Sequence, residues 1–204
     1  MKYYRGEQIK NTAINPLIVA NPPYASESTP VVLQHIKYII MNTQTASHRT
    51  SALLTLFDYH TDFFPRALVG ISEEDMHNRL NTEANHPAWL AGSLVQQRFL
   101  MASETGSGLQ QTGEELFKNH KGIQPGAKYP TIAEYTSDWQ KITPEAREAL
   151  ITIDDAKLDS EIDMGGMKMT YYELISYSIF REASVIGQLI LWRRLLGYPA
   201  MKYD

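Results

Sequence analysis

The side chains with the clearest capacity for chemistry are the histidines, because an imidazole binds metal ions and transfers protons near neutral pH. His60 lies on or beside the apolar stripe of a predicted helix, and His86 comes directly before Pro87, near the start of another. We interpret His60 as a partly buried residue with a hydrogen-bond partner, and His86 as a hydrogen-bonding residue at a helix start. The remaining histidines lie in polar surroundings and are expected to be solvated: His35, His48, His77 and His120.

The sequence lacks the elements of several common reactive centres. It contains no cysteine, which excludes a disulfide framework, a thiolate nucleophile and a cysteine-based metal site. It also lacks the Gly-x-Ser-x-Gly and Ser-x-x-Lys elements that position a nucleophilic serine. The acidic stretch from Asp154 to Asp163 does not have the spacing of a calcium-binding loop. Hydrolysis by a nucleophilic side chain is therefore not indicated.

Length, composition and charge indicate one soluble globular domain. The chain has 204 residues, of which 43% are hydrophobic and 21% charged, as is ordinary for such a domain. Its formal net charge is -4 and no basic stretch offsets it, so nucleic-acid binding is not expected. The sequence shows neither the pattern of a signal peptide nor an uninterrupted apolar run that would span a bilayer. We therefore expect a cytoplasmic protein with no membrane partner.

Apolar periodicity predicts the helices that would position these side chains. The first begins near Ser47, and its apolar residues recur at spacings of three, four and seven. Pro65 is expected to kink or end this helix. The second helix runs from about Pro87 towards Gly106. A loop with a fragment of helix is expected over residues 103–128, which hold several glycines.

Capping boxes mark the starts of two further helices. The box Thr131–Glu134 opens the third helix, which Thr143-Pro144 is expected to break or restart. After a turn or short hairpin over 154–169, the box Thr170–Glu173 opens the longest helix, which runs to about Leu196. The pattern predicts an all-α protein, a four-helix bundle with a long connection between the second and third helices.

Residues 1–44 do not share this periodicity and are interpreted as an N-terminal extension of a bundle formed by residues 45–204. Prolines punctuate the segment, and a short helix is predicted from Val31 to Ile40. A second interpretation is that Met41 is the natural start of the protein.

Two segments resemble the DinB-like superfamily, the damage-inducible four-helix bundles that include the bacillithiol transferases. The first runs from Asn85 to Leu94 and contains Trp89 and Gly92, where the family's second helix commonly reads Trp, two residues, then Gly-His-Leu. The second begins at Phe180, and its matching residues are Glu182, Ala183, Gly187, Gln188, Arg194 and Gly197. The resemblance covers residues 45–204, and it implies a homodimer.

The resemblance also implies a metal site, from which this sequence departs. In the family, one histidine of the second helix and two of the fourth bind a divalent metal ion. The corresponding residues here are Ser93, Arg181 and Val185, none of which is a suitable ligand. His86 lies roughly 10 Å from Ser93 along a helix axis, too far to replace a missing ligand. We therefore expect no metal and no other cofactor.

Arg181 would point into the bundle where the family binds its metal, and a buried guanidinium needs a partner. One interpretation is a polar contact between helices, with Asp58 or Asp62 of the first helix as the partner. A second is that Arg181 and Ser93 line a pocket for a small anionic molecule, and a third is that Arg181 lies on the surface. The residues of this candidate pocket are Ser93, Arg181, Val185, His60 and Trp89.

Two functions follow as hypotheses. The first is a small-molecule-binding or interaction protein in which Ser93, Arg181 and Val185 refill the family's metal site. The alternative is a metal-dependent thiol S-transferase or hydrolase-like enzyme of the same superfamily, which would need a divalent transition metal such as Zn or Ni. Tyr171 and Tyr172 are expected to pack in the core, with the rim of a pocket or a dimer interface as the alternative.

Overall fold

The computed structural model describes residues 44–203, and most of them are helical, which confirms the prediction of an all-α protein. Three expectations lie outside the described residues: the N-terminal extension up to residue 43, the helix from Val31 to Ile40 and the start at Met41. His35 also falls there.

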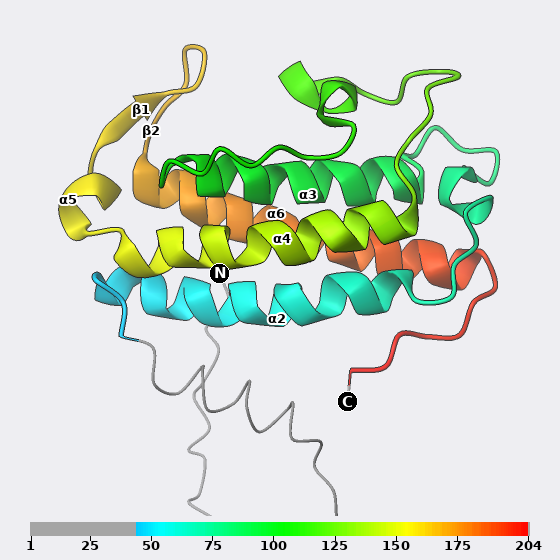
Figure 1. The fold of residues 1–204 in the computed structure, drawn as a ribbon, viewed down its shortest axis with the longest axis horizontal. Helices are drawn as coiled ribbons and strands as arrows, with labels where there is room; N and C mark the ends of the chain where they lie inside the picture. Colours follow the sequence, from blue (N-terminus) through cyan, green and yellow to red (C-terminus); the bar gives the residue numbers. More distant parts are fainter. Residues whose placement is uncertain (1–43, 204) are drawn as a thin grey trace, which may run out of the picture. The chain divides into compact units, whose positions relative to one another are not determined.

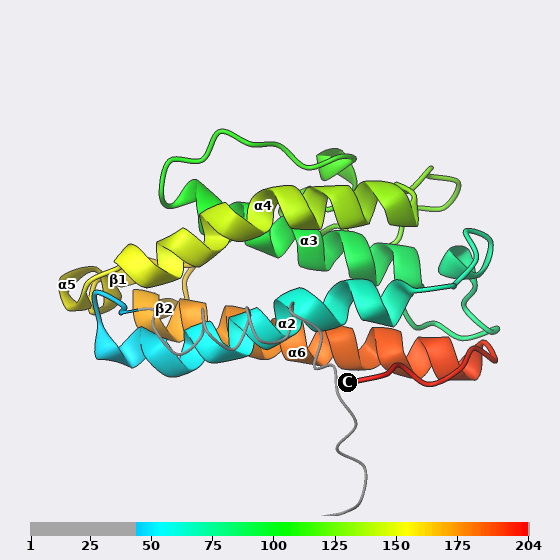
Figure 2. The ribbon, with the colours of Figure 1, turned by 60° about the horizontal axis from the view of Figure 1, so that its bottom comes forward.

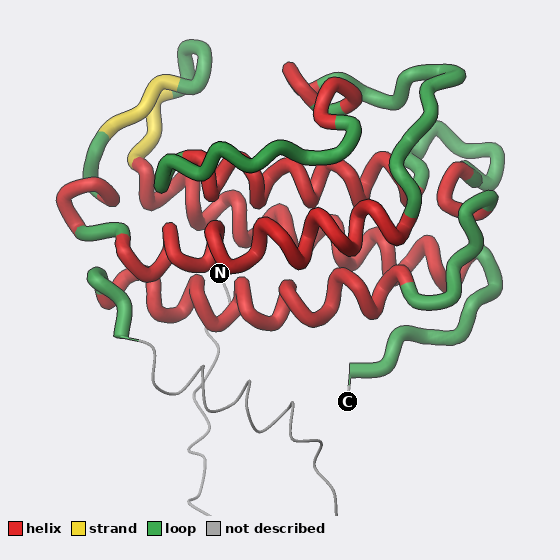
Figure 3. Tube along the Cα trace, in the orientation of Figure 1, coloured by secondary structure: helices red, strands yellow, loops and turns green. Residues whose placement is uncertain are grey.

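Four long helices make up most of the described chain: α2 (Ser51–Leu68), α3 (Pro87–Ser103), α4 (Ile132–Thr152) and α6 (Tyr171–Leu195). Between α4 and α6 lie the one-turn helix α5 (Asp155–Leu158) and an antiparallel hairpin of β1 (Glu161–Asp163) and β2 (Lys168–Thr170). The 3-10 turns are η1 (His48–Thr50), η2 (Asp75–His77), η3 (Glu114–Leu116) and η4 (Lys118–His120). Figure 3 shows the long connection between α3 and α4, which contains η3 and η4 as short helical fragments.

The long helices pack side by side, each against two others. Helix α2 contacts α4 and α6, and helix α3 also contacts α4 and α6. Figure 1 shows the four long helices running alongside one another, and Figure 2 shows α2 and α6 as one layer, with α3 and α4 as the other. The C-terminal segment returns along α2, where the Tyr203 ring lies 5.4 Å from the Phe63 ring.

The predicted capping residues begin the helices as expected. The N–H of Glu134 donates to Oγ1 of Thr131, and the Glu134 carboxylate accepts the N–H of Thr131 in return. The box Thr170–Glu173 makes the same reciprocal contacts at the start of α6. Gly197 follows the end of α6 with a φ of 87°, a conformation that glycine adopts without strain.

Neither internal proline ends its helix, which corrects the expected end at Pro65 and the expected break at Pro144. Helix α2 continues past Pro65 and α4 continues past Pro144. Pro144 lacks the N–H that would bond the Gln140 carbonyl, and both residues are exposed, so the carbonyl is accessible to water. On the other side of α4, Ile142 and Ala146 are fully buried. Burial on that side holds α4 together across the proline.

The core between the layers positions the segment that resembles the family's second helix. Leu90 and Leu94 of α3 are buried in the core. Gly92 lies under the ring of Phe117, and a Cβ there would lie only 2.0 Å from the ring's Cζ. A larger residue at this position would therefore displace the Phe117 ring, through which the α3–α4 connection packs on α3.

Helix α6 alone among the described helices is long and apolar enough to cross a membrane, judged by length and composition. The sequence interpretation did not expect such a helix. Core helices of water-soluble proteins meet the same criteria, so the observation is weak evidence for a membrane span.

Candidate functional site

Ser93 and Arg181 are 88 residues apart in the chain and are hydrogen-bonded in the structure. Nη2 of Arg181 donates to Oγ of Ser93 at 3.1 Å, and Nη1 donates to the Ser93 carbonyl at 3.3 Å. Nη1 also donates to Oε1 of Gln97 at 2.5 Å, one turn further along α3. These contacts join α3 and α6 at two of the positions that the resemblance assigns to metal ligands.

The Arg181 guanidinium is half-buried, and its hydrogen-bond partners are neutral. Burial lowers the pKa of Arg181, but an arginine remains charged in proteins. The aspartates expected as its partners are engaged elsewhere, which corrects that expectation: Asp58 pairs with Arg147, and Asp62 pairs with Arg66, each at 2.8 Å. Within residues 44–203, no carboxylate lies in ion-pair distance of Arg181.

The other three predicted pocket residues lie in different surroundings. Val185 is buried one turn after Arg181 on α6. Trp89 is half-buried near the start of α3, and its indole N–H donates to the Lys121 carbonyl at 3.1 Å. His60, expected to be partly buried with a hydrogen-bond partner, is buried, and its Nδ1 lies 3.2 Å from a carboxylate oxygen of Glu182. Of the five predicted residues, Ser93 and Arg181 are thus the two that hydrogen bonds join.

A fully buried ion pair between Arg98 and Glu182 occupies the centre of the protein. Nε and Nη2 of Arg98 donate to the two carboxylate oxygens of Glu182 at 2.8 and 2.9 Å. Both side chains are 0% exposed. Burial alone would raise the pKa of Glu182, but the charge and hydrogen bonds of Arg98, together with His60, lower it overall.

This pair was not predicted, although the sequence pattern contains a signal for it. Arg98 follows Leu94 by one helical turn, and Glu182 precedes Ile186 by one turn, so each charge stands on a buried helix face. An acid and a base at such positions predict a buried pair. The pairing itself depends on how the helices pack, which the spacing does not reveal.

The residues at the family's metal positions do not fit a divalent cation. The Arg181 guanidinium is positively charged and offers only donors, and Val185 has no ligand atom. The hydroxyl of Ser93 already accepts from Arg181 and donates to the Leu90 carbonyl. Among the described residues, no three histidine, aspartate or glutamate side chains gather where they would hold a metal ion.

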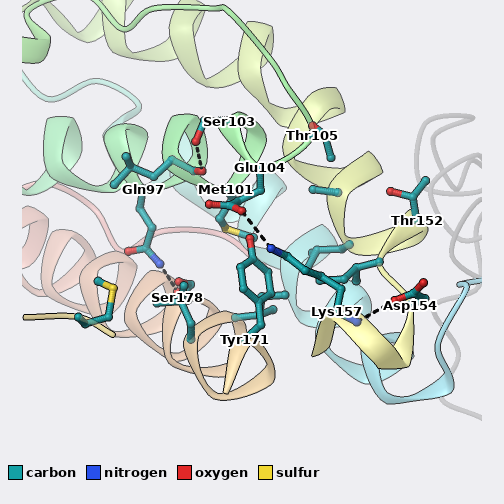
Figure 4. Close-up of a pocket in the computed structure, with 17 residues that line it drawn as sticks. Gln97, Met101, Ser103, Glu104, Thr105, Thr152, Asp154, Lys157, Tyr171 and Ser178 are labelled. Carbon is teal, nitrogen blue, oxygen red and sulfur yellow. Dashed lines mark hydrogen bonds and ion pairs between the residues drawn. The ribbon is translucent and has the colours of Figure 1, made fainter. Parts of the chain in front are cut away.

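A cavity of about 520 Å³ opens at the end of the helices where α3 and α4 finish and α6 begins. Figure 4 shows side chains from these helices and from α5 around it. Its apolar wall includes Leu100, Met101, Leu150, Ile153, Leu174 and Ile175. Pockets with mostly apolar walls and a few polar groups are typical of small-molecule sites.

Tyr171, Glu104 and Lys157 form the polar side of this cavity. Nζ of Lys157 lies 3.7 Å from the Glu104 carboxylate and 4.4 Å from the centre of the Tyr171 ring. Burial and a hydrogen bond to Glu104 raise the pKa of Tyr171, so its hydroxyl stays protonated. Tyr171 is thus both packed in the core and part of the pocket wall.

Gln97 connects this cavity to Arg181. Its side chain lines the cavity. The Gln97 amide donates to the Ser178 carbonyl at 2.6 Å, while its Oε1 accepts from Arg181. With both ends of the amide bonded, Gln97 has a fixed orientation between the cavity and the half-buried guanidinium.

No protein-family model matches this chain, and no curated protein matches it. The resemblance to the DinB-like superfamily therefore stays a prediction.

Proposed function

We propose that this protein is a DinB-like four-helix bundle that lacks the family's metal site and binds a small anionic molecule. The observation that carries the proposal is the half-buried guanidinium of Arg181, which is held by the neutral acceptors of Ser93 and Gln97. A positive charge that is partly removed from water and lacks a counter-charge favours an anion beside it. The acidic group of a ligand would supply that charge.

Two observations support the family assignment. The four long helices each pack against two neighbours, as in a bundle. Ser93 and Arg181 also meet, although only the resemblance had placed them at one site.

The cavity supports a ligand with an apolar body. It adjoins Gln97, which contacts Arg181 on its other side. We therefore propose an amphipathic anion, with its acidic group at Arg181 and its apolar part in the cavity. The proposal keeps the homodimer that the resemblance implies and a cytoplasmic location, without a nucleic-acid or membrane partner.

Elemental analysis tests the metal-free part of this proposal. Protein that is freed of any affinity tag and purified without chelator is expected to contain only traces of transition metal. Near-stoichiometric zinc, nickel, manganese or iron would contradict the proposal and favour the metal-dependent transferase.

Calorimetric titration with octanoate tests the anion site. The wild type is expected to bind octanoate and to gain thermal stability from it, whereas octylamine, with an aliphatic chain of the same length and the opposite charge, should do neither. Arg181→Gln is expected to abolish octanoate binding, because it removes the charge and keeps a polar side chain.

Lys157→Gln is the matched control, because Lys157 is the one cation among the residues that line the cavity, whereas Arg181 lies behind Gln97. This variant is expected to bind octanoate like the wild type. Binding that survives Arg181→Gln but is lost in Lys157→Gln would contradict the assignment to Arg181. Absence of octanoate binding to the wild type would contradict the proposed ligand class.

A further inference from the structure

The outer face of α6 is apolar and exposed along most of its length. Tyr177, Phe180, Leu191 and Leu195 have exposed fractions of 59%, 67%, 56% and 57%. Because successive helical residues are about 100° apart, these four project from one side of α6. Exposed Ser184 and Gly187 lie between them on the same side. We call these residues the outer α6 stripe: Tyr177, Phe180, Ser184, Gly187, Leu191 and Leu195.

Nothing in residues 44–203 explains the glycine at position 187. It lies in the interior of α6, where glycine weakens a helix relative to alanine. Its backbone does not have a positive φ, and a Cβ at this position would meet no atom within 4 Å. Nothing in the described residues therefore requires a glycine here. A close contact from outside would require one.

We infer that the outer α6 stripe binds the same stripe of a second copy, with the two α6 helices antiparallel. A two-fold axis beside Ser184 would bring each residue before Ser184 opposite one that follows it in the partner. Tyr177 lies seven residues before Ser184, and Leu191 lies seven after it, so these side chains would meet. Phe180 would pack over Gly187 of the partner, where the missing side chain leaves room.

The charges at the ends of α6 favour the antiparallel arrangement. Glu173 lies eleven residues before Ser184, and Arg194 lies ten after it. Both are exposed, and neither forms an ion pair within residues 44–203. In the antiparallel dimer, Glu173 of one copy would face Arg194 of the other at both ends. A parallel pair would place like charges opposite each other, which is unfavourable.

A second copy fits this stripe better than a lipid surface does. Ser184 lies in the middle of the stripe, and its flanks carry Glu173, Gln188 and a single arginine, Arg194, all exposed. A helix face that enters a bilayer interface is instead accompanied by a polar face rich in lysine and arginine. The apolar composition of α6 that resembles a membrane span is explained equally well by burial against a partner.

Sedimentation equilibrium of the full chain tests the inference. The wild type is expected to be a dimer, and Phe180→Glu and Leu191→Glu are each expected to be monomers with unchanged circular dichroism. Both residues are more than half exposed, so their substitution should not unfold the protomer. Met167→Glu, at another exposed apolar residue (60%) in the β-hairpin, is the matched control and should remain dimeric.

The charge pair gives a test of orientation. Glu173→Arg alone should raise the dimer dissociation constant at least several-fold. Adding Arg194→Glu should return the dissociation constant to the wild-type value, because the exchanged charges again face each other. A wild type that stays monomeric would overturn the inference. A dimer that persists in both Phe180→Glu and Leu191→Glu would overturn it as well.

Vesicles of phosphatidylcholine and phosphatidylglycerol test the competing occupant. We expect no co-sedimentation of the protein with these vesicles. Co-sedimentation that Phe180→Glu abolishes, together with a monomeric wild type, would assign the stripe to a membrane and overturn the dimer.

The outer α6 stripe gives a surface to the homodimer of the proposed function, and dimerisation through it does not depend on the ligand. If the Leu191→Glu variant is monomeric and still binds octanoate, the dimer surface and the anion site are independent of each other.

Discussion

Arg98 makes five hydrogen bonds inside the protein, to the Glu182 carboxylate, the hydroxyls of Thr61 and Thr143 and the Phe57 carbonyl. Its guanidinium carbon also lies 3.5 Å from the centre of the Trp139 ring. A guanidinium has five N–H donors, so every donor has an acceptor. The charge is therefore accommodated in the core, provided that Glu182 keeps its own charge.

Glu182→Gln is expected to lower the free energy of unfolding by about 3–5 kcal/mol, because it leaves the Arg98 charge buried without a counter-charge. Urea denaturation followed by circular dichroism measures the loss. Asp159→Asn is the control, because Asp159 pairs with Arg49 at 2.6 Å on the surface, where such pairs contribute little. Equal losses in the two variants would show that burial does not determine the value of the ion pair.

His86 links the stability of the protein to pH. Its Nδ1 accepts the N–H of Trp89 at 3.1 Å and caps α3. Burial, with the nearby charges of His77 and Arg79, lowers the pKa of His86 from 6.5 to about 4. Between these values the unfolded chain binds a proton on His86 that the folded chain does not. The free energy of unfolding therefore falls as the pH falls, by at most about 1.4 kcal/mol per pH unit.

His86→Asn is expected to reduce this dependence and to keep a capping acceptor for α3. Urea denaturation at several pH values from 6.5 down to about 4 gives the slope for the variant and the wild type. The exposed His48 provides the control, since His48→Asn should keep the wild-type slope. If His86→Asn also kept it, His86 would not be the residue responsible.

At the scale of elements, hydrogen-bonding patterns were predicted more reliably from the sequence than interruptions were. The capping boxes Thr131–Glu134 and Thr170–Glu173 begin α4 and α6 as expected, because capping depends on residues a few positions apart. The expected end of a helix at Pro65 and break of a helix at Pro144 do not occur. Whether a proline ends a helix depends on tertiary packing, and both prolines lie in helices whose other face is buried.

Pro144→Ala is expected to raise the free energy of unfolding by about 1–3 kcal/mol, because it restores an N–H to the middle of α4 and removes the proline's steric conflict. Pro144 is exposed, so the substitution should leave the core unchanged. Thermal unfolding measures the gain. Pro125→Ala, in the exposed α3–α4 connection, is the control and should give no such gain. A destabilised Pro144→Ala variant would contradict this account of α4.

At the scale of the whole molecule, the sequence predicted the helical class and brought Ser93 and Arg181 to one site, but it did not predict the cavity. The register of a resemblance was enough to relate two positions 88 residues apart. The cavity depends on where α3 and α4 end relative to α5 and the start of α6. That stagger is set by packing between elements, for which the spacing of residues within one element holds no information.

The Arg98–Glu182 pair also restricts how this sequence can change over generations. Either residue alone would leave an uncompensated charge in the core, whereas apolar residues of similar volume at both positions are tolerated in other proteins. A change at one position therefore passes through an unstable intermediate unless the other changes with it. We expect natural variants of this chain to carry both residues or neither, so that the two positions, 84 residues apart, are inherited as one unit.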